Sequence, residues 1–255
     1  MDIYKEKLIE LYERSSKHSH YQRLPEKINQ ILGLTYTSGK TRYEVERLNY
    51  ILESVPISNK FVLDIGGNTG YFSFAMLDNG AKAVRYFEGN PTHAEFVKLA
   101  SEILNLDSKL QIVNKYFLFD VSNKEKYDVA LLLNVLHHTG DDYGDEDLSI
   151  ETAKMEILKQ LNNFAATTKI LVFQLGFNWK GDRRLGLFPH GTKRELIDFI
   201  TKGTRENWEV LKIGVPQLID GKIEYMNLGE NNIKRQDELG EFLNRPLFIM
   251  KSKKF

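Results

Sequence analysis

Cysteine is absent from the 255 residues of this chain, which excludes disulfides, cysteine nucleophiles and thiolate metal sites. An excess of charge is also absent, because 35 basic residues balance 35 acidic ones. Dedicated nucleic-acid-binding proteins usually carry a basic surplus that displaces counterions from phosphates. The composition therefore gives no indication of a nucleic-acid partner, and it fits a reducing compartment.

Long apolar runs are missing as well. The N-terminus is charged every few residues and lacks the apolar core of a signal peptide. The longest apolar stretches, around Val129–Leu133 and Ile170–Phe173, are far too short to span a bilayer. We therefore expect a cytoplasmic protein with no membrane partner. Apolar residues make up 42% of the chain, which is enough for one ordinary α/β domain.

Helix and strand patterns alternate through most of the sequence. Residues 1–60 are polar with a helical period, and short apolar runs separated by helices follow. Strands are predicted at Lys60–Ile65, Ala83–Glu88, Leu110–Val113, Tyr127–Leu136, Lys169–Leu175, Trp208–Val215 and Pro246–Lys251. Helices are predicted at Tyr71–Asn79, Pro91–Leu104, Ile150–Thr167 and Lys193–Thr201. This alternation predicts a doubly wound α/β fold with a mostly parallel, seven-stranded sheet.

The ends of the chain differ from its middle. We predict an N-terminal helical extension or lid over residues 1–58 and a catalytic domain over residues 59–255. The last two predicted strands form a hairpin-like pair, and about thirty mixed residues lie between them as an insertion. That insertion contains the turn signal Asp220-Gly221.

A glycine-rich turn follows the first predicted strand, in Val62-Leu63-Asp64-Ile65-Gly66-Gly67-Asn68-Thr69-Gly70. Glycines here let the backbone approach a ligand closely, and the next helix presents free N–H groups beside it. The dinucleotide fingerprint needs glycine at the first, third and sixth positions, and counting from Gly66 or from Gly67 fails it. A P-loop would need a Gly-Lys-Ser/Thr ending, which is absent. NAD and ATP are therefore poor ligands for this turn.

The segment resembles the first motif of class I S-adenosylmethionine-dependent methyltransferases, a strand followed by Asp-x-Gly-x-Gly-x-Gly. Asp64, Gly66 and Gly70 match it, whereas Asn68 replaces the middle glycine. The resemblance implies the class I methyltransferase fold and S-adenosyl-L-methionine as cofactor, with Gly67 also in the binding turn. It places the acid and first glycines near the amino-acid end of the cofactor.

An acid at the end of the next strand is the second feature of a nucleotide-binding pattern. Glu88 ends the next predicted strand, 24 positions after Asp64. An acid at this strand end can accept hydrogen bonds from both ribose hydroxyls. Asp120 stands where the family places an acid that contacts the adenine amino group, although a solvated loop aspartate is nearly as good an interpretation. Asn134 belongs to a stretch similar to the family's fourth strand, and we include it among the cofactor-binding residues. These matches cover roughly residues 60–175.

Three histidines are candidates for a general base that would deprotonate a hydroxyl acceptor. His137 and His138 end the fourth predicted strand, at the carboxyl edge where open α/β sheets bind ligands, and His190 lies in a loop beyond the fifth. No one of the three stands out. We expect the other histidines at the surface, which are His18, His20 and His93.

Adjacent acidic residues raise the question of a metal. His137, His138, Asp141 and Asp142 cluster in sequence, but neighbouring residues seldom point at one ion, and we expect none.

The segment after the fifth strand is rich in groups that bind polar ligands. Arg183 and Arg184 could fork onto a phosphate or carboxylate, and Trp179 could stack on a ring; a solvated loop is the equal alternative. Upstream, the stretch from Ser38 to Tyr43 could form part of a lid, and Tyr43 is a further candidate for binding the acceptor.

The loops at the sheet edge, the neutral charge and the arginine pair favour a small anionic or sugar acceptor. The layout resembles bacterial methyltransferases that modify surface glycans, which implies O-methylation of a sugar, sugar phosphate or phosphate-type group in capsule or polysaccharide biosynthesis. Two alternatives stay open. One is a tRNA-modifying methyltransferase, because members acting on the wobble uridine have a similar fourth strand ending in histidine. The other is a non-catalytic adenosyl-binding partner protein. The sequence favours no oligomeric state.

Overall fold

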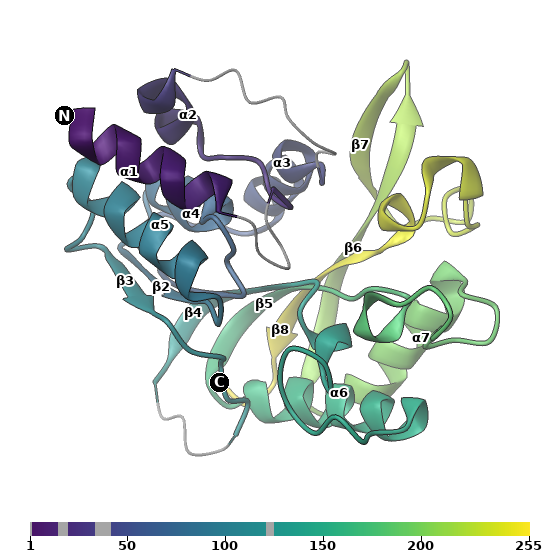
Figure 1. Ribbon diagram of the computed structural model, residues 1–255. Helices are drawn as coiled ribbons and strands as arrows, with labels where there is room; N and C mark the ends of the chain where they lie inside the picture. The colour runs from purple at the N-terminus through teal and green to yellow at the C-terminus, as the bar shows by residue number, and fades with distance from the viewer. Residues whose placement is uncertain (1, 15–19, 34–41, 121–124) are drawn as a thin grey trace. The chain divides into compact units, whose positions relative to one another are not determined.

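Eight strands and seven α-helices make up the part of the chain that the structure, a computed structural model, describes: residues 2–14, 20–33, 42–120 and 125–255 (Figure 1). Contacts divide the chain into two compact units. The N-terminal unit comprises Met1–Leu48 and Pro56–Phe117, and the C-terminal unit comprises Asn49–Val55 and Leu118–Phe255. Helix α3 (Glu44–Ser54) contributes its first half to one unit and its second half to the other.

The N-terminal unit contains a parallel three-stranded sheet. Its strands are β1 (Phe61–Ile65), β2 (Ala83–Phe87) and β3 (Leu110–Val113), in the order β3-β2-β1. The apolar run that predicted β1 is buried on both faces, as expected of a parallel strand covered by helices. Helices α4 (Tyr71–Asp78) and α5 (Pro91–Ile103) connect the three strands. The sheet therefore has the βαβαβ order that the sequence predicts.

Helix α1 (Asp2–Glu13) lies alongside α5, so that α5 is covered by α1 as well as by the sheet (Figure 1). Lys7 and Glu95 form an ion pair of 3.1 Å across the two helices, and the rings of Tyr12 and Phe96 meet at 6.0 Å. The prediction that His93 is a surface residue is wrong: it is 5% exposed, because α5 is covered on two sides. A short helix, α2 (Glu26–Leu32), also belongs to this unit.

The C-terminal unit contains a mixed sheet in the order β4-β5-β8-β6-β7. Strands β4 (Tyr127–Leu133) and β5 (Thr168–Gln174) are parallel, and β8 (Leu247–Ser252) runs antiparallel between β5 and β6 (Trp208–Ile219). Ser149 caps helix α6 (Ile150–Phe164), and a capping box of Thr192 and Glu195 begins α7 (Lys193–Thr204). The alternating helices and the parallel strands were both predicted.

The number of strands is one more than predicted. The mixed segment before β8 holds an additional strand, β7 (Lys222–Asn227), which pairs with β6 as a hairpin (Figure 1). Asp220 and Gly221 form its two-residue turn, and both have positive φ angles, 49° and 77°. The turn signal was therefore correct. The strand was missed because its residues alternate charged and apolar side chains instead of forming an apolar run.

Strand β4 ends earlier than predicted, at Leu133 instead of Leu136. Asn134 adopts the left-handed conformation with a φ of 62°, and Leu136–His138 form one turn of 3₁₀ helix. Both histidines therefore lie just beyond the strand. No helix in the described part of the chain is both long and apolar enough to cross a membrane.

Candidate functional site

The turn after β1 has three residues in the left-handed region of the backbone. Gly66 and Gly70 have φ angles of 67° and 83°, which glycine adopts without a steric penalty. Asn68 has a φ of 50°, and asparagine is among the few residues with a side chain that visit this region routinely. The replacement of the family's middle glycine by Asn68 therefore preserves the backbone path.

Gly67 is required by packing. A Cβ atom at this position would lie 2.4 Å from the ring of Tyr86 and 2.9 Å from Oδ2 of Asp64. Tyr86 is fully buried in β2, and its hydroxyl donates a hydrogen bond to the carbonyl of Asn68. Tyr86 thus stabilises the turn in two ways, because its ring packs against Gly67 and its hydroxyl binds the Asn68 carbonyl.

The carboxylate of Glu88 connects the turn to the end of β2. Oε2 accepts a hydrogen bond of 2.9 Å from the backbone N–H of Asn68, and Oε1 accepts one of 2.8 Å from the N–H of Asn90. The side-chain amide of Asn114 donates to the Glu88 carbonyl over 2.8 Å. Glu88 is only half-buried, so its carboxylate is fixed in orientation and still reachable.

Asp64 is the buried acid of the motif, with 3% of its surface exposed. Burial and, to a lesser extent, the charge of Glu88 raise its pKa from 3.8 to about 6, although Ser73 opposes this by donating a hydrogen bond of 2.7 Å to Oδ2. This carboxyl therefore titrates close to neutral pH.

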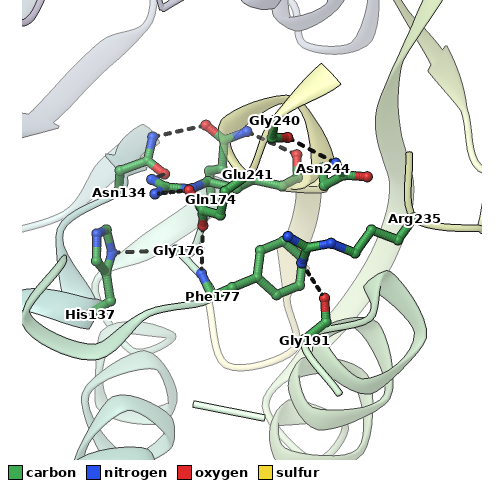
Figure 2. Close-up of polar contacts among 11 residues, drawn as sticks. Asn134, His137, Gln174, Gly176, Phe177, Gly191, Arg235, Gly240, Glu241 and Asn244 are labelled. Atoms are coloured by element: carbon green, nitrogen blue, oxygen red, sulfur yellow. Dashed lines mark hydrogen bonds and ion pairs between the residues drawn. The ribbon is translucent and has the colours of Figure 1, made fainter. Parts of the chain in front are cut away.

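In the C-terminal unit, three residues form a closed ring of hydrogen bonds at the ends of β4 and β5 (Figure 2). The side-chain amide of Asn134 donates to Gln174 over 2.9 Å, and that of Gln174 donates to the Arg245 carbonyl over 3.1 Å. The Arg245 guanidinium completes the ring with a bond of 2.7 Å to Asn134 Oδ1. Both polar groups of the Asn134 side chain therefore have protein partners, and its predicted contact with the cofactor stays a prediction.

Glu241 holds Arg245 in place. Its carboxylate accepts bonds from Nε and Nη2 of Arg245, at 3.0 and 2.6 Å, and one of 3.1 Å from the backbone N–H of Phe177. Burial alone would raise the pKa of Glu241, but the Arg245 charge and these hydrogen bonds lower it below its ordinary value. The pair therefore fixes the loop after β5 to the segment before β8.

His137 is buried, and its ring accepts a hydrogen bond of 3.3 Å at Nδ1 from the N–H of Gly176 (Figure 2). Gly176 permits this approach, because a Cβ there would lie 2.9 Å from Nε2 of the ring. A neutral imidazole that accepts at Nδ1 carries its proton on Nε2. His137 is therefore arranged as a hydrogen-bond donor at Nε2, which does not suit a general base.

His138 has the opposite arrangement. Its Nδ1 lies 3.3 Å from Oδ2 of Asp141 and 3.5 Å from Oδ2 of Asp142, and its side chain is 16% exposed. A proton on Nδ1 shared with these carboxylates leaves Nε2 as an acceptor. The three side chains also offer ligand atoms within 4.8 Å of one another, so the expected absence of a metal stays a prediction.

His190 and the two arginines lie in exposed loops beyond β5. Arg184 forms a bidentate ion pair with Asp182, which lowers the pKa of that carboxyl to about 2. The backbone N–H of His190 donates to Glu195. Trp179 is 5% exposed, and its indole N–H donates to the Thr139 carbonyl over 2.7 Å. Its buried ring offers little surface for stacking, and the acceptor-binding roles of this loop stay predictions.

The remaining predicted residues are spread along the chain. Asp120 is exposed after β3, and Tyr43 is half-buried before α3 with a φ of 55°. His20 is exposed, as predicted. His18 and the lid residues Ser38–Thr41 lie outside the described residues.

Four polar side chains with structural roles were not predicted from the sequence. One holds the turn after β1, and three hold the ends of β4 and β5: Gln22, and Gln174, Glu241 and Arg245. Each is an isolated polar residue that belongs to no motif. Their partners lie far away in the sequence, 111 positions for Arg245 and Asn134. The only local signal was that Gln174 lies near the end of the predicted strand Lys169–Leu175.

Comparison with known proteins adds a family context, although no protein-family profile matches the chain. The sequence is similar to tRNA U34 carboxymethyltransferase of Nautilia profundicola, with 26% identity over 152 residues, 55% of this chain and 45% of that protein. The match thus spans less than half of the relative's length.

Among solved structures, the fold is similar to that of WbdD, named as a bifunctional kinase-methyltransferase. One WbdD structure superimposes with a TM-score of 0.62 and 15% identity over 96% of this chain and 46% of that one. A second, with a bound kinase inhibitor, gives a TM-score of 0.63 and 16% identity over 96% and 47%. The chain therefore has the class I methyltransferase fold that the sequence predicted.

Asp64 makes the stability of the fold depend on pH. Below about pH 4 the carboxyl is protonated whether the chain is folded or unfolded. Between about pH 4 and 6 the unfolded state ionises first, so stability decreases as the pH rises, by roughly 3 kcal/mol in total for a pKa raised from 3.8 to about 6. Urea unfolding from pH 4 to 7.5 should show this loss for wild type and not for Asp64→Asn. Asp107→Asn, at an exposed site, is the control; parallel curves for wild type and Asp64→Asn would contradict the assignment.

Proposed function

We propose that this chain transfers a methyl group from S-adenosyl-L-methionine to a small anionic or sugar acceptor. One observation carries the proposal. The left-handed turn after β1 and the carboxylate of Glu88 after β2 are joined by a hydrogen bond into one rigid surface, on a chain with the class I methyltransferase fold.

The residues of this surface fit an adenosyl group. Each oxygen of Glu88 accepts one backbone N–H, and an ionised carboxylate offers about four acceptor positions in all. The half-buried carboxylate of Glu88, at the end of β2, is placed to accept hydrogen bonds from the ribose hydroxyls. Hydrogen bonds to a charged acceptor contribute roughly 1.5–3 kcal/mol each.

The bound cofactor would supply an electrophilic methyl group on a sulfonium. A hydroxyl acceptor must lose its proton as the new bond forms, and a positioned base assists this step. His138 suits the role, because Asp141 and Asp142 lie beside Nδ1 and orient its ring. His137, with Nδ1 already accepting from Gly176, suits the donation of a hydrogen bond from Nε2.

The small acceptor is supported by the balanced charge of the chain and by the exposed Arg183 in the loop after β5. Arg184 is weaker support for an anionic acceptor than Arg183, because Asp182 already neutralises the guanidinium of Arg184. The resemblance to glycan-modifying methyltransferases favours a sugar hydroxyl or a phosphate-type oxygen, in capsule or other surface polysaccharide synthesis.

A tRNA acceptor is the second candidate, and the relative named tRNA U34 carboxymethyltransferase favours it. Binding to RNA relies on neutralised phosphates and weakens steeply with salt. A chain with 35 basic and 35 acidic residues would need a local basic surface to achieve this. A non-catalytic adenosyl-binding partner is the third candidate, and it predicts cofactor binding without turnover.

Removing the carboxylate of Glu88 should weaken cofactor binding. Glu88→Ala loses both ribose hydrogen bonds, and we expect its affinity for S-adenosylmethionine in calorimetry to fall by about tenfold or more. Glu88→Gln keeps one acceptor oxygen and should lose less. Glu102→Ala, on the exposed face of α5, is the control. Unchanged affinity in Glu88→Ala would remove the ribose assignment.

If His138 is the general base, its replacement should lower turnover, whereas replacement of His190 should not. His138→Gln should lower turnover by about a hundredfold or more and leave cofactor affinity unchanged, because general bases contribute this much to proton transfer. His190→Gln changes an exposed side chain and should remain active. Both are measured by methyl transfer to whichever acceptor a screen of nucleotide sugars, sugar phosphates and tRNA identifies. Full activity of His138→Gln would contradict the assignment.

The acceptor class can be tested without knowing the acceptor itself. We expect bulk tRNA to show no shift in gel electrophoresis at low or moderate salt, because the chain has no net positive charge. A shift that disappears as salt increases, together with methyl transfer to tRNA, would favour the second candidate over the first.

A further inference from the structure

Helix α4 begins directly after the glycine turn, and no side chain at its N-cap position accepts a hydrogen bond from its first N–H groups. Its N-cap residue is Gly70, which has no side chain to accept a hydrogen bond. Helices usually satisfy these N–H groups with a serine, threonine, aspartate or asparagine at the N-cap. Asp64 in β1 accepts a hydrogen bond from the backbone N–H of Ser73, and the N–H of Tyr71 has its acceptor in a different segment.

Gln22 supplies that acceptor from the N-terminal segment. Its Oε1 accepts a hydrogen bond of 3.0 Å from the backbone N–H of Tyr71, 49 positions later in the sequence. The same oxygen lies 3.4 Å from the hydroxyl of Thr69, which is 3% exposed. One half-buried side chain thus contacts both the last part of the turn and the first residue of the helix.

These contacts continue to the carboxylate that we propose binds ribose. The backbone N–H of Thr69 donates to Oδ1 of Asn68 over 2.8 Å, and the N–H of Asn68 donates to Oε2 of Glu88 over 2.9 Å. An unbroken path of hydrogen bonds therefore leads from Gln22 through the turn to Glu88. Asn68 is the left-handed residue of the path, whose conformation these bonds fix.

We propose that Gln22 is a positioning residue of the cofactor site, which holds the turn and the start of α4 in the conformation that binds S-adenosylmethionine. The inference rests on the proposed function of the turn. A cap that served only stability would hold α4 equally well with the ligand present or absent. A positioning residue changes the affinity for the ligand, and by thermodynamic reciprocity the ligand then strengthens the contacts of Gln22.

The test compares Gln22→Met with wild type. Methionine is similar in size and lacks the amide oxygen, so the N–H of Tyr71 loses its partner. We expect the affinity for S-adenosylmethionine, measured by calorimetry, to fall by about fivefold or more. The melting temperature without ligand should fall by only about 2–4 °C, the cost of one lost helix cap. In wild type, the ligand should slow hydrogen exchange in the peptide that spans residues 20–25, and this protection should be lost in Gln22→Met.

Gln30→Met is the matched control, because Gln30 is an exposed glutamine on α2 whose amide contacts only Glu26 among the described side chains. It should match wild type in both measurements. Affinity of Gln22→Met within about twofold of wild type, or unchanged exchange of residues 20–25 on ligand binding, would overturn the inference. A wild-type chain that does not bind S-adenosylmethionine would instead overturn the proposed function, so the two failures are distinguishable.

Discussion

The carboxylate of Glu88 connects the two strand ends on which the candidate cofactor site is built. Its oxygens hold the N–H groups of Asn68 and Asn90, which belong to the turn after β1 and the start of α5. This bridge stabilises a turn in which Gly66 and Asn68 occupy conformations that most side chains avoid. The group that we propose recognises the ligand therefore also organises the surface around it.

A second carboxylate shows what a purely structural acid looks like in the same chain. Glu241 is bound by two nitrogens of Arg245 and by the N–H of Phe177, so a cation neutralises it. Glu88 accepts hydrogen bonds from the backbone N–H groups of Asn68 and Asn90, and its side chain is only half-buried. The ion pair of Glu241 joins two segments of the chain, whereas Glu88 holds the turn that we propose binds the ligand.

Local pattern predicted much of this fold, and distant pairing accounts for what it missed. The apolar run of β1, the glycine turn and the acid after β2 are short-range signals, and the fold they predicted is confirmed. Strand β7 was missed because it lies at the edge of the sheet and alternates in polarity. His93 was misplaced because its helix, α5, packs against α1 from the start of the chain as well as against the sheet. Gln22 and Arg245 could not be found from spacing, since their partners lie 49 and 111 positions away.

Glycine at position 67 is required by the packing of the protein interior, independently of any ligand. The ring of Tyr86 and the carboxyl of Asp64 occupy the space that any side chain at position 67 would need. This requirement comes from the interior of the protein and persists whether or not a ligand is ever bound. A descendant that had lost its cofactor would still retain glycine here as long as it kept Tyr86. The presence of this glycine alone is thus poor grounds for inferring an active enzyme, whereas an acid at position 88 is the more informative marker.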